Sequence, residues 1–172
     1  MRIALVRIGH RDHDGAMPFD VERLLRLWTD PLPDDDGAAE AGFRELYADP
    51  VTVNGARLTA ADLVARARLM QQALAEPERE VLAVADAGGS VAVAFRLAGR
   101  QVGPLDTPVG RLPASGQRIE LRVIDVLTVA DGRVTGIWMV ADWLPAVAAA
   151  GAVHLPAEID EAEASPRPPT GR

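Results

Sequence analysis

The chain has 172 residues, of which 48% are hydrophobic and 25% charged, so it suits one globular domain with its own core. Its net charge of −7 argues against nucleic acid as a partner, because phosphate binding needs a basic face. The sequence contains no cysteine, which excludes disulfides, thiolate metal sites and a cysteine nucleophile, and which fits a cytoplasmic location.

The two ends of the chain differ from the middle. Residues 1–18 form an N-terminal extension, in which "RIALVRI" is either a short strand at a sheet edge or a loose segment. Residues 154–172 are acidic and then proline-rich, which predicts a disordered tail. No segment has the roughly 18 apolar residues of a membrane span, so we expect no membrane partner. The domain is therefore expected over 19–153.

Helical patterns dominate the first half of the domain. Apolar spacing predicts helices over 19–30, 39–49 and 59–76, and Thr59 with Asp62 forms a capping-box signal. The three aspartates between the first two helices resemble a metal site only superficially, because consecutive acids point in different directions. We therefore predict no metal.

Strand patterns follow in the second half. After a short strand at 50–55, period-two alternation predicts longer strands over 79–89, 90–100, 117–132 and 133–143. A long glycine- and proline-rich loop separates the second and third of these, and a small helix is expected over 146–153. Helices first and strands later predict an α+β fold, with the helices on one face of a curved antiparallel sheet.

The last two strands meet at a two-residue hairpin turn, Asp131-Gly132. Uninterrupted pairing from this turn places Asp125 opposite Trp138 and Val123 opposite Val140. One face would then carry two carboxylates and an indole, in the set Leu121, Val123, Asp125, Trp138, Val140 and Asp142. We expect this face to line a cavity for a hydrophobic small molecule and the opposite apolar face to pack against a second subunit in a homodimer.

Several segments together resemble the SnoaL-like polyketide cyclase family. They are "FRELYADPVTVNG", "GPLDTPVGRLPASGQ", "RIELRVIDVL" and the W-x-x-x-D of Trp138–Asp142 before a short helix. The resemblance covers about residues 19–151. It implies the cone-shaped α+β barrel of the nuclear-transport-factor-2-like (cystatin-like) superfamily and a role in secondary metabolism such as antibiotic biosynthesis. It also implies an aspartate acid/base, no cofactor, and a polyketide-type carbonyl substrate.

The resemblance assigns the acid/base role to Asp142; from the residues alone, Asp142 is equally a solvated strand end or the cap of the following helix. Trp138 is a cavity wall or a core residue, and Val123 and Val140 belong to the same face. These cyclases often carry a histidine before the long loop, where this chain has Arg100 and Gln101.

Three further polar residues are candidates for the cavity. Asp125 is a second polar group or the partner of Arg96 or Arg122. Tyr47 is a hydrogen-bond donor, as in ketosteroid isomerases, or a core residue. Arg96 interrupts an apolar strand, so that Asp125, Arg96 and Asp142 would form a set that resembles epoxide hydrolases.

Three functions follow from these candidates. The first is a cyclase or isomerase that acts on a hydrophobic carbonyl compound. The second is a non-catalytic binding or dimerisation module of the same fold, and the third is an epoxide hydrolase or epoxide-opening cyclase.

Overall fold

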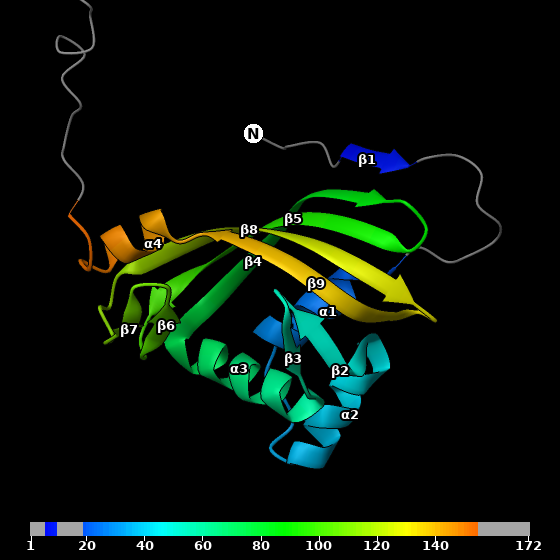
Figure 1. Ribbon diagram of the computed structural model, residues 1–172. Helices are drawn as coiled ribbons and strands as arrows, with labels where there is room; N and C mark the ends of the chain where they lie inside the picture. Colours follow the sequence, from blue (N-terminus) through cyan, green and yellow to red (C-terminus); the bar gives the residue numbers. More distant parts are fainter. Residues whose placement is uncertain (1–5, 10–18, 155–172) are drawn as a thin grey trace, which may run out of the picture.

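The computed structural model describes residues 6–9 and 19–154 (Figure 1). The predicted tail lies outside these residues, apart from His154, as does most of the predicted extension. In the described part, the helices are α1 (Val21–Thr29), α2 (Asp36–Leu46), α3 (Ala60–Ala73) and α4 (Leu144–Ala149). The strands there are β1 (Val6–Gly9), β2 (Tyr47–Val53), β3 (Ala56–Leu58), β4 (Leu74–Asp86), β5 (Ser90–Gln101), β6 (Leu105–Thr107), β7 (Gly110–Leu112), β8 (Arg118–Ala130) and β9 (Arg133–Asp142).

Side-chain caps fix where the first three helices begin. The Asp20 and Asp35 carboxylates each accept a hydrogen bond from a backbone N–H three residues further on, and Thr59 with Asp62 forms the predicted capping box. The structure thus confirms the three predicted helices. Their bounds differ by up to three residues: α2 begins earlier than predicted because Asp35 caps it and ends at Leu46, and α3 ends at Ala73, where β4 follows directly.

The sheet is mixed but mainly antiparallel. Within the described residues its strand order is β1-β4-β5-β8-β9-β2-β3, and the pairs β1–β4 and β2–β9 are parallel. Figure 1 shows the sheet curving over α1, α2 and α3, which cover one of its faces. This arrangement confirms the α+β class, with a curved, unclosed sheet wrapped on the N-terminal helices.

The loop predicted after β5 contains a small hairpin, β6–β7, that the sequence pattern did not indicate. Gln101 fixes the base of this segment. Its buried side chain donates to the carbonyl oxygens of Gly103 and Pro113 and accepts a 2.7 Å hydrogen bond from Ser115. Gln101 therefore has a structural role, because it joins both ends of the loop.

The pairing of β8 with β9 differs from the prediction by one residue. The turn forms as expected, with Asp131 and Gly132 at positive φ and Ala130 opposite Arg133. The register then shifts, because Val129 pairs with Val134 but Thr128 pairs with Gly136. Thr135 is thus the extra residue of a β-bulge on β9.

The bulge exchanges the two faces of β9 beyond it. Asp125 lies opposite Met139, and the predicted partner Trp138 lies opposite Val126. On β8, alternate residues from Ile119 to Leu127 are buried, so Asp125 faces the helices. Trp138 and its neighbours of the same face point to the outside.

The core has two parts. One lies between the helices and the middle of the sheet and is built on large buried side chains such as Leu24, Phe43 and Leu63. The other lies towards α4 and includes Leu97 and Leu121. A cavity lies where the two meet, since its lining includes residues from both.

Candidate functional site

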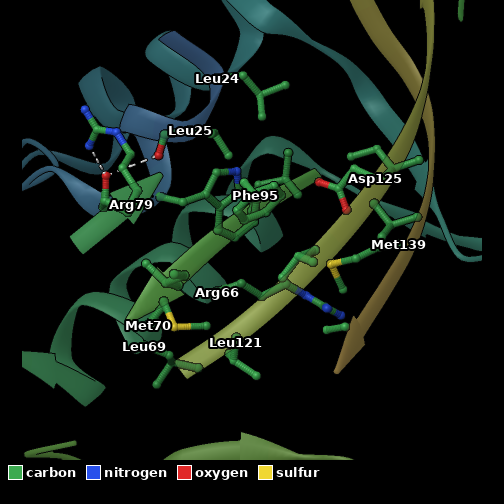
Figure 2. Close-up of a pocket in the computed structure, with 18 of the residues that line it drawn as sticks. Leu24, Leu25, Arg66, Leu69, Met70, Arg79, Phe95, Leu121, Asp125 and Met139 are labelled. Carbon is green, nitrogen blue, oxygen red and sulfur yellow. Dashed lines mark hydrogen bonds between the residues drawn. The ribbon is translucent and has the colours of Figure 1, made fainter. Parts of the chain in front are cut away.

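A largely apolar cavity of about 610 Å³ opens between the sheet and the helices. Its volume is in the range of small-molecule sites. Its walls come from α1, α3, the strands β5, β8 and β9, and the loop after β5, with apolar linings such as Leu24, Leu25, Met70, Phe95, Leu121 and Met139 (Figure 2).

Asp125 is the buried carboxylate of this cavity. It is 7% exposed, and among the described residues its Oδ1 atom has no hydrogen-bond partner. Figure 2 shows the carboxylate on β8, directed into the cavity. Burial raises the pKa of Asp125 to about 6, because desolvation disfavours the charged form. A carboxyl group with such a pKa exchanges protons near neutral pH.

Tyr47 and Trp28 supply hydrogen-bonding groups in the same cavity. The Trp28 indole N–H donates a 2.9 Å hydrogen bond to the Tyr47 hydroxyl, which is buried. Burial raises the pKa of Tyr47, this hydrogen bond partly offsets the rise, and the charge of Asp125 adds to it. Tyr47 is therefore a neutral hydroxyl. Within the described part of the chain, no acceptor takes its hydrogen.

Phe43 holds these two aromatic rings in place. Its ring centroid lies 5.7 Å from that of Trp28, edge-on, and 5.7 Å from that of Tyr47. The side chain is fully buried, so it leaves both rings little freedom to move.

Three of the predicted site residues line this cavity: Tyr47, Val123 and Asp125. Strand alternation placed Val123 and Asp125 correctly on the inner side, whereas Tyr47, expected in the helix over 39–49, begins β2 because α2 ends at Leu46. The roles predicted for them stay predictions.

The predicted cavity positions of Trp138, Val140 and Asp142 are wrong. Trp138 is 68% exposed, Val140 is 72% exposed, and Asp142 is exposed at the end of β9. The physical reason is the bulge at Thr135, which turns these side chains to the outer face. Asp142 does not cap the closing helix either, because α4 is preceded by Trp143 and has no side-chain cap. Asp142 is therefore the solvated end of a strand, which was one of the alternatives that the sequence left open.

The predicted set of Asp125, Arg96 and Asp142 does not assemble. The Arg96 guanidinium donates to Glu80 at 3.1 Å and to Glu120 at 3.2 Å. Arg96 lies opposite Arg122 in the sheet, on the face away from Asp125. The epoxide hydrolase hypothesis thus loses the geometry that motivated it.

Several lining residues, namely Trp28, Phe95, Met139 and Trp143, were not predicted from the sequence. Trp28 belongs to the apolar spacing that predicts the first helix, but such spacing does not show which residue meets a cavity. Phe95 and Trp143 also line the cavity, and each lies next to a charged residue, Arg96 and Asp142, that the pattern favoured as a site residue. Met139 was missed because the bulge reversed its face.

Among residues 6–9 and 19–154, no three histidine, aspartate or glutamate side chains converge as metal ligands. Of the helices in the described part, none is both long enough and apolar enough to cross a membrane.

Residues 23–149 match the family of SnoaL-like polyketide cyclases. The match spans well over half of the chain, and the chain therefore belongs to this family. No curated protein matches the sequence.

Solved structures show the same fold. TsrD from Streptomyces laurentii is 20% identical with a TM-score of 0.63, over 77% of this chain and 92% of TsrD. A candidate SnoaL-like polyketide cyclase from Jannaschia sp. CCS1 is 24% identical with a TM-score of 0.60, over 83% of this chain and 100% of its own. A protein from Catenulispora acidiphila DSM 44928, in complex with trimethylamine, has a ketosteroid isomerase-like fold; it is 15% identical with a TM-score of 0.55, over 76% and 91% of the two chains. Family and fold together support a cyclase- or isomerase-type function.

Proposed function

We propose that the chain is a cofactor-independent cyclase or isomerase that uses Asp125 as its acid/base on a hydrophobic, polyketide-type carbonyl compound in secondary metabolism. Family membership supports the reaction class. The observation that supports the residue is the burial of Asp125 in the apolar cavity with an unpaired oxygen atom. The resemblance had assigned this role to Asp142, which the bulge on β9 turns to the outer face, so Asp125 is the carboxylate that we propose instead.

The chemistry begins with Asp125 ionised. Its carboxylate removes a proton from the carbon next to a substrate carbonyl, and the enolate so formed is stabilised by the conjugation of the substrate. In a cyclisation, the enolate carbon attacks a second carbonyl of the same molecule, and the new alkoxide takes the proton back from Asp125. In an isomerisation, the proton returns at another carbon. A pKa near 6 suits both directions of transfer.

Tyr47 stabilises the charge that develops on the carbonyl oxygen. Its hydroxyl accepts from Trp28 and so has its own hydrogen available to donate. A neutral donor fixed in an apolar cavity stabilises an enolate oxygen more strongly than water does, because it is already oriented. The apolar walls also exclude water and hold the substrate in a folded conformation.

An exchange assay tests this proposal without knowledge of the natural substrate. We expect the protein to accelerate deuterium incorporation from D₂O into 2-tetralone, a hydrophobic ketone with acidic α-protons, as measured by NMR. Asp125→Asn should lower this rate by roughly 10²-fold or more, since general acid/base groups contribute about 10²–10⁴. Binding of 2-tetralone should persist in the variant.

Asp142→Asn is the matched control, because Asp142 is an exposed carboxylate on the outer face. It should retain the full rate. A wild-type protein that binds such ketones without any acceleration would favour the non-catalytic binding module, and equal losses in both variants would contradict the role of Asp125.

The outer face of the sheet supports the predicted homodimer. It carries four adjacent exposed apolar side chains from β8 and β9, namely Ile124, Val126, Trp138 and Val140. Exposed apolar patches mark association surfaces. Arg122 and Asp142 lie opposite each other beside this patch, so two copies related by a two-fold axis can bring opposite charges together.

Analytical ultracentrifugation tests the homodimer. We expect a dimer for the wild type and a monomer for Trp138→Lys. Leu69→Lys, which changes an apolar side chain on α3 with 44% exposure, should leave the dimer intact. A monomeric wild type at micromolar concentration would refute the proposal.

A further inference from the structure

Four charged residues stand out among the described residues that line the cavity: Arg66, Arg79, Asp106 and Asp125. Two of them are already neutralised by neighbours. Arg79 donates to Asp30 at 2.7 Å and also bonds Thr29. Asp106 accepts two hydrogen bonds from Arg111, at 2.7 and 3.0 Å, which lower its pKa.

Arg66 and Asp125 are the two that have no such partner. In the described part of the chain, Arg66 has no carboxylate oxygen within 4.0 Å and makes no side-chain hydrogen bond. The nearest acid on its own helix, Asp62, is one turn earlier and is bonded to Thr59 in the capping box. The charge of Arg66 helps to lower the pKa of Asp62, but among the described residues its guanidinium forms no ion pair or hydrogen bond and is free to bind a ligand.

The position of Arg66 adds to this observation. It lies on the side of α3 that also presents Leu63 and Met70 to the cavity, where an apolar residue would be the usual choice. In Figure 2 its side chain leaves α3 and extends along the cavity towards the strands, on the side of Met139. It is solvent-exposed, so it belongs to the mouth of the cavity, whereas Asp125 is buried.

We infer that Arg66 binds an anionic group of the substrate, so that the substrate class is a hydrophobic carbonyl compound with a free carboxylate at one end. This inference rests on the proposed function, because it uses Asp125 as the group that meets the reacting carbon. The guanidinium of arginine presents paired N–H donors that match the two oxygens of a carboxylate.

The separation of the two charges favours a ligand that spans them. Arg66 and Asp125 form no ion pair with each other, and no cation among the described residues offsets the effect of burial on the pKa of Asp125. A carboxylate at the mouth would neutralise Arg66 and leave the apolar part of the ligand among the leucines. It would also fix which end of the molecule enters first and thus which carbon reaches Asp125.

A pair of probes tests the assignment: anthraquinone-2-carboxylate and its methyl ester, which differ in charge but share an apolar carbonyl body. Binding is measured by calorimetry at 50 mM and 500 mM NaCl. We expect the wild type to bind the carboxylate about fivefold more tightly than the ester at low salt, as suits a partly exposed ion pair. Salt should reduce this difference.

Arg66→Gln should remove the preference for the carboxylate and leave the affinity for the ester unchanged, and Arg66→Lys should keep part of the preference. The matched control is Arg68→Gln, on the same helix, because Arg68 binds Asp36 and the carbonyl oxygen of Pro33 outside the cavity. It should keep the preference in full.

The outcomes separate the two proposals. Equal binding of both probes by the wild type, or a preference that survives Arg66→Gln, overturns the assignment of Arg66 and leaves Asp125 unaffected. Failure of both probes to bind counts against the cavity as a site for such compounds, and so overturns the inference together with the proposed function. If Asp125→Asn loses the deuterium exchange of 2-tetralone but still prefers the carboxylate probe to its ester, both the role of Asp125 and that of Arg66 are supported.

Discussion

Trp28 and Tyr47, which are 19 residues apart in the sequence, are joined by a 2.9 Å hydrogen bond from the indole N–H to the phenol oxygen at the wall of the cavity. The bond orients the Tyr47 hydroxyl, whose oxygen atom acts as the acceptor. The hydrogen of the hydroxyl is left for a ligand. Tyr47 can then act as the donor that stabilises negative charge on a carbonyl oxygen.

Tyr47→Phe is expected to lower the exchange rate of 2-tetralone by roughly 10²-fold, the loss typical of one oriented donor. It also leaves the Trp28 N–H without its acceptor, which should lower the free energy of unfolding by about 1–2 kcal/mol. NMR exchange and urea denaturation measure the two effects separately.

Trp28→Phe is the control for this variant, because it removes the hydrogen bond and keeps the hydroxyl. Its rate should fall much less than that of Tyr47→Phe. Equal rates for the two variants would show that the hydroxyl acts only through its bond to Trp28.

The rate should depend on pH through Asp125. The base is active when ionised, and burial raises its pKa to about 6. We expect kcat/KM for exchange to rise tenfold per pH unit below about pH 5 and to level off above about pH 7. A profile measured between pH 4 and 8 checks this. A flat profile over that range would exclude a carboxylate with this pKa as the base.

The same carboxylate should make the folded protein less stable as pH rises. Its pKa is about 6 in the folded chain and near the ordinary aspartate value of 3.8 in the unfolded chain. The folded state thus binds more protons between about pH 4 and pH 6, and stability falls across this window. At pH 7 the ionised group costs about 3 kcal/mol, at 1.4 kcal/mol per pH unit.

Asp125→Asn should therefore be more stable than the wild type at pH 7, by about 1–3 kcal/mol, and about equal to it at pH 4. The upper value assumes that the amide finds partners as good as those of the neutral acid. Urea denaturation at both pH values measures the difference. Asp142→Asn should show no such pH-dependent gain, and a destabilised Asp125→Asn at pH 7 would contradict burial of an ionised group.

Local signals in the sequence were sufficient for the first three helices and for the four long strands, although not for the short strands β3, β6 and β7. Caps such as Asp20 and the box at Thr59 act within one turn of backbone, so they can be recognised without tertiary contacts. The strand pattern was also sufficient to place Asp125 and Val123 on the inner face of β8, because that strand alternates regularly.

The face of β9 could not be predicted in this way. Both faces of the hairpin are apolar, so either register buries comparable side chains, and one extra residue at Thr135 decides between them. The neighbouring strand β2 also shifts its register against this part of β9, which shows that tertiary pairing is involved. Gly136 was the available signal, since glycine inside a strand often marks a bulge.

The mouth of the cavity depends on a close approach at Gly103. A Cβ atom there would lie 2.5 Å from the carbonyl oxygen of Gln72, at the end of α3. Next to it, the N–H groups of Val102 and Gly103 donate to the carbonyl oxygen of Ala73. The three residues that follow, Pro104, Leu105 and Asp106, line the cavity.

Gly103→Ala should therefore push this loop away from α3, lower the free energy of unfolding by about 1–3 kcal/mol, and weaken the binding of anthraquinone probes. The matched control is Gly42→Ala within α2, where the new Cβ would meet only the Leu27 side chain at 3.7 Å. That variant should be more stable by about 0.5–1 kcal/mol, because alanine favours the helix. Urea denaturation and calorimetry measure both, and a Gly103→Ala protein with unchanged stability and binding would show that the loop does not need this approach.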